Sequence, residues 1–331
     1  MLLFLLACSE PPEPGVLYDG QRLPVVDMHL HSGDWEGVPS GTQSFIARNF
    51  PFPFNLDPET TAKSTLSAEG IVEQLDIAAI SHGVVFAVYA PRSVGVASNE
   101  TISAQVAEAP GRLWGLASLP IESWETGEEA ALAQLEAALQ EPGMVGIKLA
   151  HTHMHQRMDD PDYYSIYALA AAQGAPLYLH TGSSPFPGTQ PDPAYTDPRY
   201  LEEAIALHPD ADFILGHACY DFINEDTLDL DSCVDLARRY PNVYIEISAL
   251  GSSSSDARAE DYPVVLDRLR SEGLTERVIY GSDGPQRPGF LLAYLERTVS
   301  VMEEVGYTDA EARAVLSDNF TALFGLDAVT L

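Results

Sequence analysis

Eight short apolar runs, each followed by a segment with a helical pattern, are the feature that most constrains the fold of this chain. They span residues 24–29, 83–90, 113–119, 145–150, 176–180, 212–217, 243–248 and 278–282. Most of these runs are continuously apolar, which is typical of parallel strands covered on both faces. A strand-then-helix alternation repeated eight times predicts a single-domain (β/α)8 barrel. A doubly wound open sheet is the alternative, but no GxGxxG sequence follows the first run.

The expected helices begin at recognisable N-terminal signals, which lie at Ser67, Thr126, Asp160, Asp197 and Thr308. The two aspartates are each followed by a proline, which fits the first position of a helix. Thr126 and Thr308 each have a glutamate three residues later, which is the spacing of a capping box. The signal at Thr308 predicts an extra helix near the C-terminus.

A long segment follows the first strand, from residue 32 to about residue 63, and contains the sequence FIARNFPFPFN. Loops of this length are often functional, so we expect either a lid that faces the substrate or an ordinary surface insertion. Arg48 lies in this segment and is the arginine that can be placed nearest the first strand end. It is therefore a candidate contact for a substrate carboxylate.

Polar side chains gather at the C-terminal ends of the expected strands, where barrel enzymes place their catalytic groups. His29 and His31 end the first strand and can face the same side, because residues i and i+2 of a strand do so. His180 ends the fifth strand, His217 the sixth and Asp283 the eighth. Imidazoles with a carboxylate suit one divalent transition metal, with Zn as the first expectation and Mn, Fe or Co as alternatives. Such a metal lowers the pKa of its water toward about 7, which predicts a hydroxide nucleophile.

This order of strand-end residues resembles the amidohydrolase superfamily of metal-dependent barrels. The phrases that resemble its amidohydrolase-related branch run from residue 24 to 326 and are VVDMHLHSG, GIKLAHTH, DDPDYYSIYALAAAQGAPLYLHTG, LGHACYD, VIYGSDGP and LSDNFTALFGL. That branch includes aminocarboxymuconate-semialdehyde decarboxylase, other non-oxidative decarboxylases, and hydrolases of lactones and amides. The resemblance implies that His29, His31, His180 and Asp283 bind one metal. It also implies that Asp283 accepts a proton from the metal-bound water, while His217 contacts the substrate or that water.

Lys148 and Glu246 are two further polar residues within the expected strands. In two-metal members of the superfamily, a lysine on strand four is carboxylated and bridges the ions. The resemblance to the one-metal branch instead places Lys148 beside the metal ligands or against a substrate anion. Glu246, in the seventh strand, is expected to be a buried, hydrogen-bonded carboxylate rather than a base.

Three further histidines, His151, His153 and His155, follow strand four. If this segment is extended, alternation puts all three imidazoles on one side, and a second metal site is one alternative. No motif supplies a carboxylate partner for such a site. We therefore expect His151 at the rim of the active site as a substrate contact, and the other two in the loop.

The first residues, MLLFLLACSEPPEPG, resemble the lipobox of bacterial lipoproteins. Cys8 would then be lipidated, residues 1–22 would form a signal and tether, and residues 23–331 the barrel, anchored in the bacterial cell envelope. The alternative is a functionless apolar terminus or a misplaced start codon, because no basic residue precedes the run, and the protein would then be cytoplasmic. Cys219 and Cys233 are either a disulfide, which an oxidising compartment permits, or two free thiols.

The charge of the chain limits its partners. Seventeen basic and 49 acidic residues give a net charge of −32. Such a surface repels nucleic acid and anionic lipid, so we expect a small-molecule substrate, no nucleic-acid partner, and membrane contact only through the lipid anchor. Barrels of the family that the chain resembles often pair, so a homodimer is one alternative, and the sequence itself does not indicate the oligomeric state.

Three functions are compatible with this sequence. The first is a hydrolase that acts on a C–N or C–O bond of a small carbonyl compound through a metal-activated water. The second is a non-oxidative decarboxylase on the same site, which needs a cationic pocket, and Arg48 alone supports it. The third is a non-catalytic envelope binding protein, which a missing ligand would favour, although every ligand position is filled.

Overall fold

A closed barrel of eight parallel strands forms the centre of the molecule. The computed structural model describes residues 13–121, 124–227, 229–250 and 257–331. The strands follow one another around the sheet in chain order: β3 (Val26–Leu30), β4 (His82–Phe86), β7 (Leu113–Ala117), β8 (Met144–Leu149), β9 (Leu177–Leu179), β10 (Phe213–Leu215), β11 (Val243–Glu246) and β12 (Val278–Ile279). The first and last strands meet through Met28 N, which donates to Tyr280 O at 3.1 Å, and Asp283 N, which donates to His29 O at 3.0 Å. The predicted (β/α)8 barrel is confirmed.

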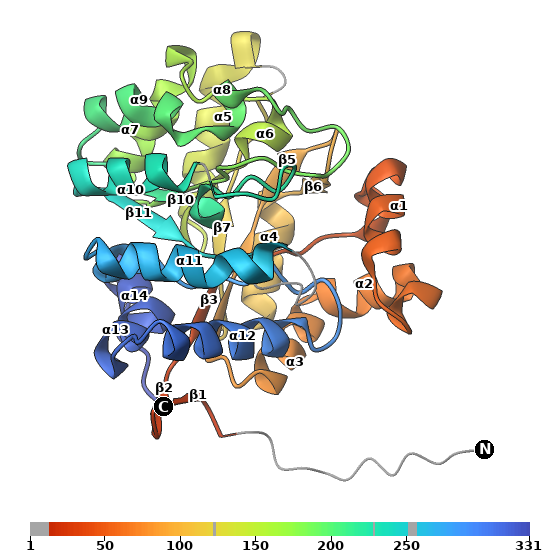
Figure 1. Ribbon diagram of the computed structural model, residues 1–331. Coiled ribbons are helices and arrows are strands. Elements are labelled where there is room, and N and C mark those ends of the chain that lie inside the picture. The colour runs from red at the N-terminus through yellow and green to blue at the C-terminus, as the bar shows by residue number, and fades with distance from the viewer. Residues whose placement is uncertain (1–12, 122–123, 228, 251–256) are drawn as a thin grey trace.

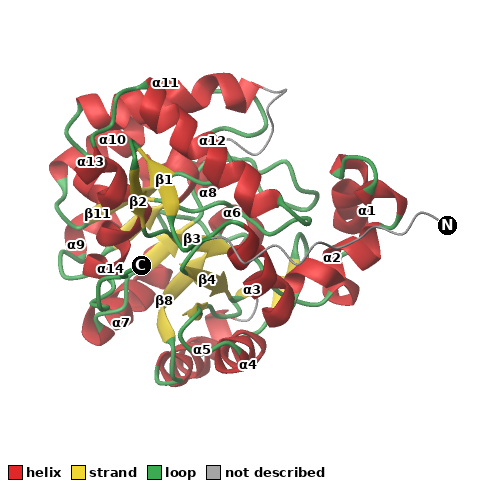
Figure 2. Cartoon of the chain, turned by 90° about the horizontal axis from the view of Figure 1, so that it is seen from below, coloured by secondary structure: helices red, strands yellow, loops and turns green. Residues whose placement is uncertain are grey.

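Helices surround the strands on the outside, as both views show (Figure 1, Figure 2). They are α3 (Ala68–Ile77), α4 (Asn99–Glu108), α5 (Trp124–Leu139), α7 (Tyr164–Gln173), α9 (Glu202–Leu207), α10 (Leu230–Arg239), α11 (Ala257–Ser271) and α12 (Phe290–Glu304). Four of the predicted start signals are confirmed: the side chains of Ser67, Asp160, Asp197 and Thr308 each accept a hydrogen bond from a backbone N–H of the turn that follows. Helix α5 begins before Thr126, whose side chain lies outside the described residues.

The C-terminal segment closes the barrel at the end opposite the strand-end histidines. After α12 come α13 (Asp309–Arg313), a π-helical turn (Ala314–Asp318) and α14 (Asn319–Leu323). Asn319 Nδ2 donates to the carbonyls of Thr275 and Val278, each at 2.7 Å, where β12 begins. Phe320 is buried in the same apolar cluster as Val26 and Met28 of β3. The expected extra C-terminal helix is therefore present.

The segment after β3 is mostly helical, so the expectation of a long loop was wrong there. It contains α1 (Ser40–Asn49) and α2 (Pro58–Leu66), which stand to one side of the barrel in Figure 1. Asp57 caps α2 by accepting from Thr60 N at 3.1 Å, and Pro58 occupies its first turn. The segment is rich in aromatic, proline and glycine residues, which is typical of a loop, so the helix start at Asp57 was not predicted.

Two hairpins were not predicted. Strands β1 (Val16–Tyr18) and β2 (Gln21–Leu23) pair in antiparallel fashion, and β5 (Val88–Ala90) pairs with β6 (Gly95–Ala97). Tyr18 is buried and donates to Tyr307 O at 2.7 Å. The folded part of the described chain therefore includes residues 16–22, which were expected to belong to the tether.

Cys8 and the rest of residues 1–12, which carry the lipobox prediction, lie outside the described residues. Within the described part of the chain, no helix combines the length and the apolar character needed to cross a membrane.

Cys219 and Cys233 form a disulfide, with their Cα atoms 6.2 Å apart. Of the two alternatives that the sequence left open, the structure contains the bonded pair. It ties the turn after β10 to α10.

Candidate metal centre

Three of the four predicted ligands meet at the carboxyl end of the barrel. One nitrogen of His29, one nitrogen of His31 and one oxygen of Asp283 all lie within 4.8 Å of one another. Asp283 Oδ1 is 2.8 Å from His31 Nε2 and 3.2 Å from His29 Nε2. Closure of the barrel between the first and last strands places these side chains together. We call His29, His31 and Asp283 the ligand cluster.

The protonation states in the ligand cluster suit a cation. Burial lowers the pKa of His29 well below its usual range, although the charge of Asp283 acts in the opposite direction. Burial opposes ionisation of Asp283, but the neighbouring His29 and the hydrogen bond from His31 outweigh it and hold its pKa below the usual range. His29 Nε2 is buried and has no hydrogen-bond partner among the described residues. An unpartnered buried nitrogen beside an ionised carboxylate is the donor set that a divalent transition metal takes.

His180, the fourth predicted ligand, is not one of the residues whose ligand atoms lie within 4.8 Å of one another in the ligand cluster. Its Nδ1 is 3.1 Å from His217 Nε2, and the two ring centroids are 4.6 Å apart. The other nitrogen, His180 Nε2, is buried and unpartnered among the described residues. His180 therefore has one nitrogen available at the site.

His217 sits on an unusual turn. His217, Ala218 and Cys219 have φ angles of 57°, 48° and 59°, a left-handed conformation that residues with a side chain rarely adopt in succession. Both ring nitrogens of His217 face side chains, with Nδ1 2.8 Å from Ser248 Oγ and Nε2 3.1 Å from His180 Nδ1. A direct contact between His217 and a substrate therefore requires the contact with His180 to open.

Three buried residues lie behind the histidines and form what we call the inner network: Glu246, Tyr178 and Ser248. Glu246 Oε2 accepts from Tyr178 OH and from Ser248 Oγ, each at 3.0 Å, which confirms the expected buried, hydrogen-bonded carboxylate. The sequence arguments missed Tyr178 and Ser248. Strand alternation was the available signal, because Tyr178 precedes His180 by two residues and Ser248 follows Glu246 by two.

Lys148 lies within the barrel, against aromatic rings. Its Nζ is 3.9 Å from the ring centroid of Tyr178 and 4.7 Å from that of Phe86. Burial lowers the pKa of Lys148 to about 7, although the charges of Asp283 and Glu246 act in the opposite direction. The rings of Phe86 and Tyr178 also pack against His29, with centroids 4.7 and 4.9 Å apart, so Lys148 lies near the predicted ligands.

The histidines after β8 are arranged differently from the expectation. Residues His151–Met154 form the short helix α6, so the alternation of an extended segment does not apply. His151 is fully buried, and neither of its ring nitrogens has a hydrogen-bond partner among the described residues. His153 instead packs edge-on against His180, with ring centroids 5.0 Å apart. The histidine of this segment that reaches the site is therefore His153, not His151, while His155 contacts Gly188 O at 2.7 Å.

Arg48 is not brought to the ligand cluster. It lies exposed in the last turn of α1, which stands apart from the barrel (Figure 1). The sequence could not show this, because the position of α1 depends on tertiary packing.

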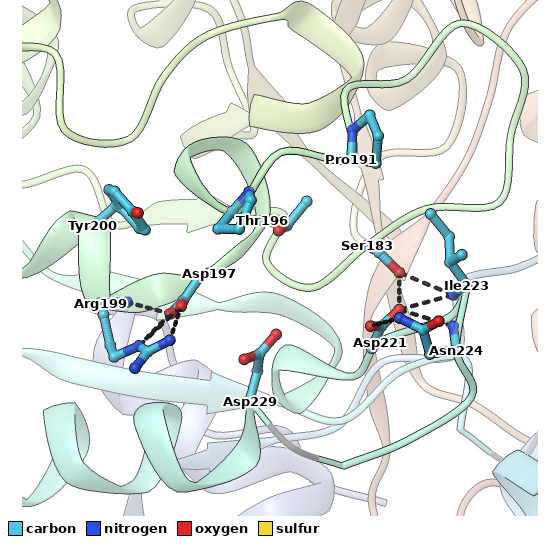
Figure 3. Close-up of a pocket in the computed structure, with 11 residues that line it drawn as sticks. Ser183, Pro191, Thr196, Asp197, Arg199, Tyr200, Asp221, Ile223, Asn224 and Asp229 are labelled. Carbon is cyan, nitrogen blue, oxygen red and sulfur yellow. Dashed lines mark hydrogen bonds and ion pairs between the residues drawn. The ribbon is translucent and has the colours of Figure 1, made fainter.

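A polar pocket of about 430 Å³ is lined by Ser183, Pro191, Pro193, Thr196, Asp197, Arg199, Tyr200, Asp221, Ile223, Asn224 and Asp229. Figure 3 shows two hydrogen-bonded groups on its wall, Asp197 with Arg199 and Ser183 with Asp221, and Asp229 between them. Burial and the charges of Asp197 and Asp221 raise the pKa of Asp229 to about 6. None of the predicted site residues lines this pocket, so it is distinct from the ligand cluster.

Known structures share the architecture. An uncharacterized TIM-barrel protein from Bordetella bronchiseptica is 20% identical, with a TM-score of 0.68 over 92% of this chain and 99% of that one. A probable 2-pyrone-4,6-dicarboxylic acid hydrolase from Acinetobacter baumannii is 17% identical, with a TM-score of 0.61 over 92% of this chain and 100% of that one. A dihydroxybenzoic acid decarboxylase from Polaromonas, solved with bound manganese, is 17% identical, with a TM-score of 0.63 over 93% and 98% of the two chains.

No curated protein matches the chain by sequence. The sequence model of the amidohydrolase family, in contrast, matches residues 26–326, which include every strand of the barrel and the whole ligand cluster. The chain belongs to the amidohydrolase family.

Proposed function

We propose that this protein is a metal-dependent hydrolase that cleaves a C–N or C–O bond of a small carbonyl compound, such as an amide, a lactone or an ester. The observation that carries this proposal is the buried Nε2 of His29, which makes no hydrogen bond within the described part of the chain and lies 3.2 Å from the carboxylate of Asp283. A buried polar atom without a partner is unfavourable unless it has a ligand. The ligand cluster is accordingly interpreted as the site of one divalent transition metal.

Each residue of the site has a proposed task. His29, His31 and Asp283 would hold the metal, and His180 Nε2 is the fourth candidate nitrogen. When bound, such a metal supplies Lewis-acid polarisation of the substrate carbonyl and an activated water. Asp283 has a second carboxylate oxygen on which it can accept a proton, and His31, which is partly exposed, faces the solvent side of the ligand cluster. Zn is the first expectation, and the manganese in the related decarboxylase structure supports Mn as an alternative.

Non-oxidative decarboxylation is the second candidate function. Solved decarboxylases share this fold, and Lys148 supplies a buried amine beside the ligand cluster. Against it, Arg48, the one arginine that was expected to bind a departing carboxylate, lies on the exposed surface of α1. Hydrolysis therefore remains the leading proposal.

A substrate screen on the metal-loaded protein tests the proposal. The panel contains esters, lactones, amides and unsaturated or aromatic carboxylic acids, with acid release and CO2 release measured in parallel. We expect acid release without CO2, and we expect it to disappear after chelation and in Asp283→Asn. CO2 release would establish the decarboxylase instead, and full turnover after complete chelation would overturn the metal-dependent proposal.

A further inference from the structure

One carboxylate oxygen of Glu246 determines the direction of the hydrogen bonds in the inner network. Glu246 Oε2 receives three donors: the backbone N–H of His217, the hydroxyl of Tyr178 and the hydroxyl of Ser248, each at 3.0 Å. Glu246 is fully buried. A hydroxyl group has a single proton to donate, so both hydroxyl protons point at Glu246. This holds whether or not Oε1 of Glu246 is protonated, because Oε2 accepts in either state.

The two hydroxyl oxygens can then only accept hydrogen bonds from the imidazoles. His29 Nδ1 lies 3.0 Å from Tyr178 OH and 3.0 Å from Ser248 Oγ. His217 Nδ1 lies 2.8 Å from Ser248 Oγ. The proton in each contact must come from the ring nitrogen, and the single proton on His29 Nδ1 is shared between the two hydroxyl oxygens. His29 and His217 are therefore both held as the tautomer protonated on Nδ1.

The same reasoning extends to a third ring. A neutral His217 that is protonated on Nδ1 has a lone pair on Nε2, which is 3.1 Å from His180 Nδ1. The hydroxyl proton of Tyr178 does not compete for this lone pair, because Tyr178 OH is 3.5 Å from His217 Nε2 and nearer to Glu246. His180 therefore donates from Nδ1 and keeps a lone pair on its own Nε2. The Nε2 atoms of His29 and His180 are both buried and make no hydrogen bond among the described residues, as this pattern requires, while Asp283 Oδ1 lies 3.2 Å from His29 Nε2.

We infer that Glu246 is a positioning residue that, through Ser248 and Tyr178, fixes the tautomers of His29, His217 and His180 and so leaves the Nε2 lone pairs of His29 and His180 free to bind a cation. This inference deepens the proposed function, on which its relation to a metal rests. It also explains a second group of potential ligand atoms, in His29, His217 and Glu246, as a hydrogen-bonded unit rather than a second metal site.

Two glycines leave the space that the inner network occupies. A Cβ at Gly216 would lie 2.2 Å from Tyr178 OH, and a Cβ at Gly281 would lie 2.2 Å from Glu246 Oε1. Neither glycine has a positive φ angle, so close approach rather than backbone conformation requires glycine there. Gly216 of the LGH sequence and Gly281 of the YGSD sequence therefore provide the space that the inner network needs.

Metal affinity in matched variants is the first part of the test. Ser248→Ala and Tyr178→Phe each remove one hydroxyl of the inner network. Ser118→Ala and Tyr167→Phe are the controls, because those hydroxyls are also buried but have no hydrogen-bond partner among the described residues. We expect the dissociation constant for Zn²⁺, measured by competition with a chelator, to rise about 10- to 100-fold in the first pair and to stay unchanged in the controls. Ser248→Thr, which keeps a hydroxyl, should restore most of the affinity.

The second part of the test reads the tautomers directly, without metal or substrate. In zinc-free protein labelled with ¹⁵N-histidine, the signals of the three rings are assigned by their loss in His29→Asn, His180→Asn and His217→Asn. We expect all three wild-type rings to be protonated on Nδ1, and at least one to change tautomer in Ser248→Ala. Protonation on Nε2 in the wild-type protein would overturn the inference. A wild-type protein with the expected tautomers that binds no metal would instead contradict only the proposed function.

Discussion

His29 Nε2 lies 3.2 Å from Asp283 Oδ1, although the two residues belong to the first and the last strand regions of the barrel. The backbone reinforces this pairing, since Asp283 N donates to His29 O at 3.0 Å. Asp283 also has a left-handed backbone, with a φ angle of 68°, which a residue with a side chain adopts only when its surroundings hold it there. The seam at which the barrel closes is therefore also the centre of the candidate site.

Exchanging His151 and His153 for leucine should give opposite results. His151 is buried, and within the described ranges neither of its ring nitrogens has a hydrogen-bond partner, so His151→Leu removes two unsatisfied groups. We expect its free energy of unfolding to stay equal or to rise by about 1 kcal/mol. His153→Leu removes the contact of His153 Nδ1 with Ser93 Oγ at 3.1 Å and should lower it by about 1 kcal/mol. Urea denaturation measures both, and greater damage from His151→Leu would contradict the assignment of these two side chains.

Loss of the disulfide should destabilise the fold. Cys219 and Cys233 are separated by 14 residues in the chain. Closing a loop of this length contributes about 3 kcal/mol in the chain-entropy model. The double variant Cys219→Ser/Cys233→Ser should lose about that amount in urea denaturation. A reductant should shift the urea denaturation curve of the wild-type protein toward that of the variant and leave the curve of the variant unchanged. If the two curves coincide without reductant, the result would argue against the disulfide.

Lys148 should make stability depend on pH in a defined direction. Burial lowers its folded-state pKa to about 7, against 10.5 for an ordinary lysine. Between these values the unfolded chain binds more protons than the folded one, so the contribution of Lys148 to the free energy of unfolding increases as the pH rises from 7 to 10. The stability of metal-free wild-type protein relative to Lys148→Met should therefore improve across that window. A difference between the two proteins that stays constant from pH 7 to 10 would contradict the lowered pKa.

The fold was largely predictable because its signals are local. Apolar runs locate all eight strands, and caps such as Ser67 and Thr308 locate helix starts. The helices α1 and α2 could not be predicted, because the composition of this segment is typical of a loop. Tertiary contacts set the position of these helices beside the barrel. The β1–β2 hairpin was missed because Tyr18 is anchored by Tyr307, a residue distant in sequence.

The candidate site was predictable as far as strand ends determine it. His29, His31 and Asp283 follow from their positions after β3 and β12. Which of His151 and His153 reaches the site could not be predicted, because it depends on whether the segment after β8 is extended or helical. The hydrogen bonds of the inner network also could not be read from sequence, because proton positions depend on distances between several strands.

Metal binding by the wild-type protein and by Asp283→Asn tests the central claim most directly. Metal-free protein is titrated with Zn²⁺ in competition with a chelator, bound metal is quantified, and circular dichroism checks that the fold is retained. The exposed carboxylate variant Glu59→Gln is the control. We predict one tightly bound Zn²⁺ per wild-type and control chain, and an affinity at least about 100-fold weaker for Asp283→Asn. A wild-type protein that binds no divalent transition metal, or a folded Asp283→Asn that binds it equally well, would contradict the account.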